Sequence, residues 1–312
     1  MSRLARFAWV TLGWSLAVIL WGAFVRATGS GAGCGAHWPL CNGEVLPRAP
    51  ALATMIELTH RVTSGLALVL VVTLVVWVFR RRPHGHAARR AATASVVLIL
   101  TEALVGAGLV LFELVAENES VARALFMAVH LVNTFLLLAA LTLTARFADE
   151  GAPEKPPGAR RHTWLFGLAF LCLVLVGASG AVAALGDTLY PAESLLAGLA
   201  QDLSPTTSIL VRLRLLHPIL ALAGTLAVAL TSARVLQTSD SSKPRRWAWI
   251  AASLALVQVG AGFLNVALLA PIWMQILHLW LADLMWIAFV LLASHALFSA
   301  APAPARAGVV PA

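Results

Sequence analysis

Long apolar runs separated by short polar segments dominate the chain. Eight of these runs approach or exceed the roughly 20 apolar residues that a helix needs to cross a bilayer. They cover residues 7–26, 52–79, 91–112, 122–145, 163–185, 208–233, 247–269 and 272–298. Because a chain in lipid must satisfy its backbone hydrogen bonds internally, each run is predicted to be an α-helix. The pattern therefore predicts an all-α polytopic membrane protein.

The two halves of the chain resemble each other. Residues 147–162 are rich in proline, glycine and charge, as expected of a linker, and four runs lie on each side. The third run contains Val105-Gly106-Ala107-Gly108 and the seventh contains Val259-Gly260-Ala261-Gly262, small residues that let helices approach closely. We predict two tandem, pseudo-symmetric four-helix bundles, residues 1–146 and 163–298, and a flexible tail at 299–312.

Composition and charge support this topology. The chain is 60% hydrophobic and 12% charged, with a mean hydropathy of +0.86, which excludes a soluble domain. The net charge is +8, but most lysine and arginine residues lie near the two termini and in the segments after the second, fourth and sixth runs. The positive-inside rule makes these parts cytoplasmic, including both termini. Topology explains the basicity, so the expected partner is the lipid bilayer and no nucleic acid.

Six arginines depart from this trend and fall on the predicted outer side. They are Arg26, Arg48, Arg61, Arg123, Arg212 and Arg214. Arg61 and Arg214 stand close in sequence to His60 and His217, where a guanidinium could bind a carboxylate of a ligand. The alternative is a side chain that only extends to the membrane interface. The sequence leaves both interpretations open.

Each even-numbered run has a histidine about 6 to 10 residues from its predicted outer end. They are His60, His130, His217 and His278. An ionisable group inside a membrane is costly and indicates function. A lone buried histidine is more often a hydrogen-bonded interior residue, but four at one depth in duplicated positions favour ligation. Imidazole is a normal axial ligand of haem iron, so one pair in each half predicts two haem-sized pockets side by side.

An acid distinguishes the first pair from the second. Glu57 stands three residues before His60, on the same helix face, where a carboxylate could move protons or stabilise positive charge. The alternative is an interfacial pair with Arg61. An arginine, not an acid, stands three residues before His217, which predicts one reactive site and one electron-transfer site. Two further acids are predicted inside the membrane without an assigned role, Glu102 and Asp283.

Two cysteines lie in the first predicted outer segment. Six residues separate Cys34 from Cys41, and disulfides persist on the outer side of a membrane. A structural disulfide and a redox-active one both remain open. A zinc site with His37 would lack a fourth ligand.

Together these features resemble the haem A synthase family over essentially the whole chain. The resemblance rests on the two similar halves, the histidine in each even-numbered run, the segment Glu57-Leu58-Thr59-His60-Arg61 and the Cys34–Cys41 segment. It implies oxidation of a methyl group of haem O to a formyl group, by two successive hydroxylations and loss of water. The product, haem A, serves terminal oxidases.

The resemblance also implies roles for particular residues. Glu57 would be the catalytic carboxylate, and the cysteine pair a disulfide involved in electron transfer. Side chains expected to contact the substrate haem O are His60, His130 and Arg61. Axial ligands expected for a haem b cofactor are His217 and His278. Candidates for binding haem propionates are Arg214 and Arg212. Candidate partners are a haem O synthase (a prenyltransferase) in the same membrane and further copies of the chain.

Other function classes explain less of the pattern. A quinol-linked b-type cytochrome would use the histidines but would not require Glu57 in one pocket only. A transporter would explain the duplication but leave the histidines without a role. A prenyltransferase is disfavoured because no pair of Asp-rich loops is present to bind magnesium diphosphate. Since no long N-terminal extension precedes the first run, a bacterial plasma membrane is expected.

Overall fold

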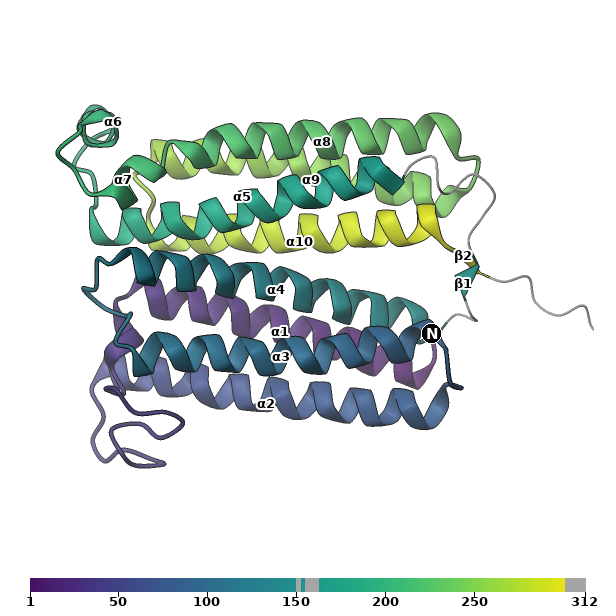
Figure 1. The fold of residues 1–312 in the computed structure, drawn as a ribbon, viewed down its shortest axis with the longest axis horizontal. Coiled ribbons are helices and arrows are strands. Elements are labelled where there is room, and N and C mark those ends of the chain that lie inside the picture. Colours follow the sequence, from purple (N-terminus) through teal and green to yellow (C-terminus); the bar gives the residue numbers. More distant parts are fainter. Residues whose placement is uncertain (150–152, 155–162, 301–312) are drawn as a thin grey trace, which may run out of the picture.

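The computed structural model describes residues 1–149, 153–154 and 163–300, and most of these are helical (Figure 1). Eight helical segments in this part of the chain are long and apolar enough to cross a membrane. Seven are single helices: α1 (Arg3–Ala27), α2 (Leu52–Arg81), α3 (Ala87–Leu111), α4 (Val121–Phe147), α5 (Thr163–Leu189), α9 (Ser242–Ala267) and α10 (Ile272–Leu297). The prediction of an all-α polytopic membrane protein with eight spans is confirmed.

The remaining span is interrupted, which the apolar pattern did not reveal. It consists of α7 (Ile209–Leu213) and α8 (Leu216–Thr238). Pro218 explains the break, because proline has no N–H to donate to the carbonyl four residues earlier, that of Arg214. That carbonyl instead accepts from the N–H of His217 at 3.2 Å. The break therefore falls directly before a predicted ligand.

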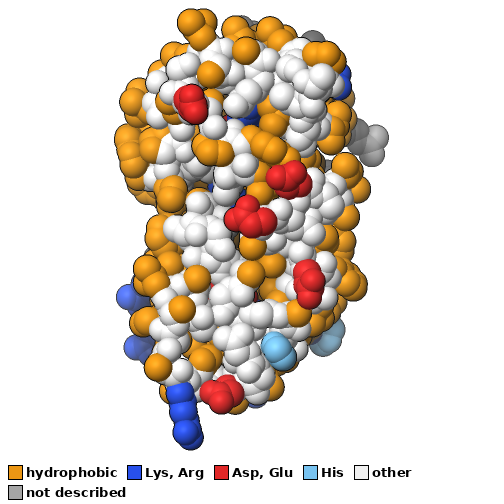
Figure 2. Space-filling view, turned by 90° about the vertical axis from the view of Figure 1, so that its left-hand side faces the viewer, with side chains coloured by type: hydrophobic (Ala, Val, Ile, Leu, Met, Phe, Trp, Pro, Cys, Tyr) orange, Lys and Arg blue, Asp and Glu red, His pale blue; other side chains and the backbone are white. Residues whose placement is uncertain are grey.

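The helices form two neighbouring groups in Figure 1, with α1 to α4 in one and α5 and α8 to α10 in the other. Helices α4 and α10 pack against each other across the boundary. Helix α1 begins where α10 ends, which we call the terminal end. The opposite end, which we call the loop end, carries the cysteine segment and the short helix α6 (Leu195–Leu203). Figure 2 looks onto the loop end, where acidic side chains lie among hydrophobic ones.

Two very short strands, β1 (Pro153–Glu154) and β2 (Ser299–Ala300), pair antiparallel at the terminal end. Most of the predicted linker (147–162) and of the predicted tail (299–312) lies outside the described residues. The pseudo-symmetry, the division into two binding halves and the cytoplasmic position of the termini stay predictions.

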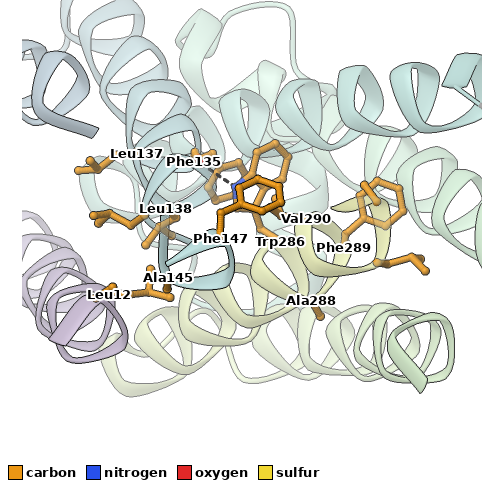
Figure 3. Close-up of a cluster of buried hydrophobic side chains, with 14 of the residues drawn as sticks. Leu12, Phe135, Leu137, Leu138, Ala145, Phe147, Trp286, Ala288, Phe289 and Val290 are labelled. Atoms are coloured by element: carbon orange, nitrogen blue, oxygen red, sulfur yellow. Dashed lines mark hydrogen bonds between the residues drawn. The ribbon is translucent and has the colours of Figure 1, made fainter. Parts of the chain in front are cut away.

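Aromatic packing joins the two groups (Figure 3). Phe135 of α4 stacks on Trp286 of α10 with ring centroids 4.9 Å apart. The indole N–H of Trp286 donates to the Phe135 carbonyl at 2.6 Å. Gly177 of α5 makes room for the ring, since a Cβ there would lie 2.7 Å from Phe135 Cε2. This buried contact fixes the walls of the cavity described next.

Candidate functional site

A large cavity lies between the two groups of helices and receives side chains from both. Its volume is about 1250 Å³, above the roughly 300–1,000 Å³ of ordinary small-molecule pockets. All four predicted histidines line it. It extends to the loop end, where Trp38 and Leu199 form part of its wall. The structure thus brings the four histidines to one connected space, and the prediction of two haem pockets within it stays a prediction.

Each histidine ring faces a glycine of a neighbouring helix. A Cβ added at the glycine would lie 2.9 Å from Cε1 of the ring for Gly22 and His60, 3.9 Å for Gly106 and His130, 3.0 Å for Gly180 and His217, and 3.2 Å for Gly262 and His278. A side chain at three of these positions would displace the ring. The small residues at 105–108 and 259–262 were expected to bring helices together. Gly106 and Gly262 in these segments also leave space for the imidazole rings of His130 and His278.

The second pair of histidines faces each other directly. The ring centroids of His217 and His278 are 6.4 Å apart, with ring planes at 86°. His278 Nε2 lies 3.2 Å from Gln258 Nε2, and Nδ1 of His278 has no hydrogen-bond partner among the described residues. Two imidazoles at this spacing would be able to hold one iron between them.

Unpaired ring nitrogens support the same interpretation. Nδ1 of His60, of His130 and of His278 is buried and has no hydrogen-bond partner among the described residues. Buried polar atoms are normally bonded, so such nitrogens indicate an interaction with something that enters the cavity. His217 Nδ1 lies 3.1 Å from the hydroxyl of Ser179. Within the described chain no group of three or more His, Cys, Asp or Glu could hold a free metal ion, whereas a haem needs only axial ligands from the protein.

Glu57 is buried and already bonded on both oxygens. It is 3% exposed. Its Oε1 accepts from Arg61 Nη2 at 2.5 Å and from Arg61 Nε at 3.1 Å, and its Oε2 accepts from the backbone N–H of Cys34 at 2.8 Å. The pair with Arg61 that the sequence left open is present. It is buried and lines the cavity rather than lying at an exposed interface.

The cysteine segment is fastened to the start of α2. Cys34 and Cys41 form a disulfide, and both are buried. Arg61 Nη1 donates to the carbonyls of His37 and Leu40 at 2.6 and 2.7 Å. With both cysteine sulfurs in the disulfide, the zinc alternative loses its ligands. The Glu57–Arg61 pair therefore connects this loop to the helix that carries His60.

Glu102, to which the sequence assigned no role, contacts a predicted ligand. Its Oε1 lies 3.3 Å from Nδ1 of His130. The hydroxyl of Thr134 donates to the same oxygen at 2.5 Å, and the amide of Asn133 donates to the other oxygen. Asp283 differs, because it is fully buried and neither carboxylate oxygen has a partner among the described residues.

Comparison with known proteins identifies the family to which this chain belongs. Residues 5–290 match the model of the COX15-CtaA family, described as a cytochrome oxidase assembly protein. The chain belongs to this family, the haem A synthases. It is 30% identical over 280 residues to a haem A synthase of Staphylococcus carnosus, covering 87% of this chain and 84% of the relative. It is accordingly a multi-pass bacterial membrane protein.

Other relatives align over only part of their length or of this chain. A haem A synthase of Alkalihalophilus pseudofirmus is 38% identical over 153 residues, 49% of each chain. A Thermus thermophilus protein named protoheme IX farnesyltransferase is 51% identical over 296 residues, 95% of this chain. This chain spans about half the length of that Thermus relative, 49%.

In this haem A synthase family member, most of the arginines predicted to bind a carboxylate of the ligand already bond other groups of the chain. Arg61 is engaged with Glu57 and with loop carbonyls. Arg214 bonds two carboxylates, those of Asp187 at 3.0 Å and Asp202 at 2.7 Å. Arg212 is exposed and is not part of the cavity wall.

Two other arginines line the cavity and bond only neutral groups among the described residues. Arg26 donates to the Ala184 carbonyl at 2.7 Å and to Gln275 Oε1 at 2.8 Å. Arg123 donates to the Ala116 carbonyl at 2.5 Å, and its Nε has no partner within the described chain. Sequence reasoning placed both arginines on the outer side but could not show that they turn inward.

Proposed function

We propose that this chain is an oxidoreductase that converts a methyl group of haem O to a formyl group and so produces haem A for terminal oxidases. The observation that carries the proposal is the asymmetric cavity. Two histidine pairs line it, and the buried Glu57 carboxylate stands beside the first pair only. Family membership supports a haem as the ligand. Two successive hydroxylations and loss of water would replace the methyl group by an aldehyde.

The two pairs are assigned different haems. His60 and His130 would hold the substrate haem O, and His217 and His278 would hold haem b as the resident cofactor. The 6.4 Å spacing of the second pair and the unpaired nitrogens of His60 and His278 support this assignment. When bound, the haem iron would supply the redox chemistry. The glycines opposite the four rings provide the space that this requires.

Glu57 is proposed as the acid–base and electrostatic group of the first site. Arg61 stabilises its negative charge, and a fixed carboxylate can stabilise positive charge that develops on a reacting carbon or hold a proton released from it. The Cys34 N–H bonds the same carboxylate, so the disulfide loop helps to orient it. Whether the disulfide also exchanges electrons is a separate question that thiol labelling during turnover would answer.

We further propose that a haem farnesyltransferase works beside this chain and supplies haem O. The name of the Thermus relative, which is about twice as long as the aligned segment, supports this partner. The same name makes farnesyl transfer the second candidate function. The absence of Asp-rich loops in the sequence speaks against it.

Pigment extraction from the purified protein tests these alternatives. Haem O or haem A together with haem b supports the synthase. Haem b alone would favour a b-type cytochrome, and absence of any haem would favour a transporter. In a second arm, the protein is given iron protoporphyrin IX and farnesyl diphosphate, and formation of haem O would reassign it as the transferase.

A further inference from the structure

His130 differs from the other three histidines in what its ring contacts. Its Nδ1 lies 3.3 Å from a carboxylate oxygen of Glu102. Within the described residues, no other histidine of the cavity has a carboxylate at ion-pair or hydrogen-bond distance. His217 has a hydroxyl beside Nδ1, and Nδ1 of His60 has no hydrogen-bond partner.

The Glu102 carboxylate is held in place from α4. Thr134 donates to Oε1, and Asn133 donates to Oε2 and also to the Leu98 carbonyl at 2.9 Å. The hydroxyl of Thr101 donates to the Asn133 side-chain oxygen at 2.6 Å, which fixes the amide. A carboxylate fixed in this way presents the same oxygen to His130 permanently.

The second half of the chain carries an amide at the matching position. Glu102 stands four residues before Gly106, the glycine that faces His130. Gln258 stands four residues before Gly262, the glycine that faces His278. Gln258 also contacts its histidine, with its Nε2 at 3.2 Å from His278 Nε2. At this matching position the first half has Glu beside Nδ1 of its histidine, and the second half has Gln beside Nε2 of its histidine.

Nδ1 of His130 lies 3.3 Å from the fixed Glu102 oxygen but outside hydrogen-bond geometry. We propose that Glu102 is a positioning residue that would accept from Nδ1–H when the His130 ring turns to hold an iron, and that would thereby set the properties of the first haem site. This rests on the proposed function, in which His130 is an axial ligand. Accepting from Nδ1 fixes the tautomer that leaves Nε2 free for a metal, and it makes the imidazole a stronger electron donor. A stronger donor stabilises the oxidised iron. Glu102 therefore lowers the reduction potential of a haem held by His60 and His130 relative to the same site without this carboxylate.

Potentiometry on paired variants tests the inference. Full-length Glu102→Gln is prepared in a His217→Ala/His278→Ala background, so that only the first site can bind added iron protoporphyrin IX. A second variant, Glu102→Asp, is prepared in the same background, since it keeps the negative charge but draws the carboxylate back from the His130 ring. Glu113→Gln removes an exposed acid just beyond the end of α3 and serves as the control. Midpoint potentials are read from the haem absorption bands, without reference to activity.

We expect Glu102→Gln to raise the potential of the first site, Glu102→Asp to raise it by a smaller amount, and Glu113→Gln to change nothing. If Glu102 only joins α3 to α4, haem will bind at unchanged potential in both Glu102 variants, and the inference is refuted while the proposed function stands. If the first site binds no haem even with Glu102 intact, the proposed ligand pair itself is refuted, and the inference with it. Should Glu102→Gln fail to fold, Glu102→Asp alone decides, since an unchanged potential in that variant contradicts the proposed effect of the carboxylate.

Discussion

Replacing Glu57 by Gln tests the buried carboxylate that joins the cysteine loop to α2. The side chain is nearly isosteric, so packing changes little, but the bonding changes. The carboxylate accepts from Arg61 on one oxygen and from Cys34 N–H on the other. A glutamine has one carbonyl oxygen, so its NH₂ group must face one of these two donors. Either the arginine or the loop loses its acceptor.

The size of the effect follows from these contacts. Hydrogen bonds to charged groups are worth about 1.5–3 kcal/mol, and breaking a buried ion pair costs about 3–5 kcal/mol. Arg61 keeps two carbonyl partners, so we expect a local cost of about 2–4 kcal/mol. At 1.36 kcal/mol for each factor of ten, opening of the disulfide loop becomes about 30- to 900-fold more favourable. If the carboxylate also acts in the chemistry, haem O oxidation falls by about 10²-fold or more.

The assay measures both effects in one preparation. Disulfide reduction is followed by maleimide labelling after addition of a reductant, in a Cys172→Ser background because Cys172 is a free thiol. Haem O, its hydroxylated intermediate and haem A are quantified in extracts of cells that express the variant. Glu44→Gln is the control, since Glu44 is an exposed acid of the same loop.

Each readout can contradict a different part of the reasoning. Unchanged reduction kinetics would show that the Cys34–Glu57 bond does not hold the loop. Near wild-type haem A would remove Glu57 from the mechanism and strengthen the cytochrome alternative. Accumulation of the hydroxylated intermediate would limit Glu57 to the second oxidation.

Three further predictions concern the histidines and the loop. His278→Ala should remove resident haem b, and a full haem b signal in its reduced-minus-oxidised spectrum would refute the pairing with His217. Gly180→Ala should lower haem b content because its Cβ would meet the His217 ring at 3.0 Å. Gly167→Ala on the same helix, with open space around it, should not lower it. Equal haem content in the two variants would argue against the packing explanation. Cys34→Ser should lower activity or stability while leaving haem b bound, and loss of haem b would show that the loop supports the second site as well.

The sequence predicted the helices well because lipid imposes a simple rule on length and apolarity. All eight spans appear near their predicted bounds, and the four histidines share one cavity. The break before His217 was missed because a continuous apolar run conceals the effect of Pro218. Its local signal was present, since proline near the start of a run disrupts the bond to residue 214.

Side-chain partners were predicted less well than positions. Helical spacing gave the Glu57–Arg61 pair as an alternative, but the bond to Cys34 depends on how a loop folds back. Arg214 was proposed for a ligand carboxylate, and its partners Asp187 and Asp202 come from a separate helix and α6. The link from Glu102 to His130 joins residues 28 positions apart on two helices, and no local pattern encodes it.

Conversion of haem O to haem A by this chain is the most direct test of the central claim. The protein is expressed in a bacterial host that makes haem O but no haem A, and the extracted haems are separated and identified by mass spectrometry. We predict that haem A appears with the wild-type chain and not with His60→Ala, while haem b stays bound to that variant. Haem O left unchanged by a folded, haem b-loaded wild-type protein, in the presence of a functioning respiratory chain, would contradict the account.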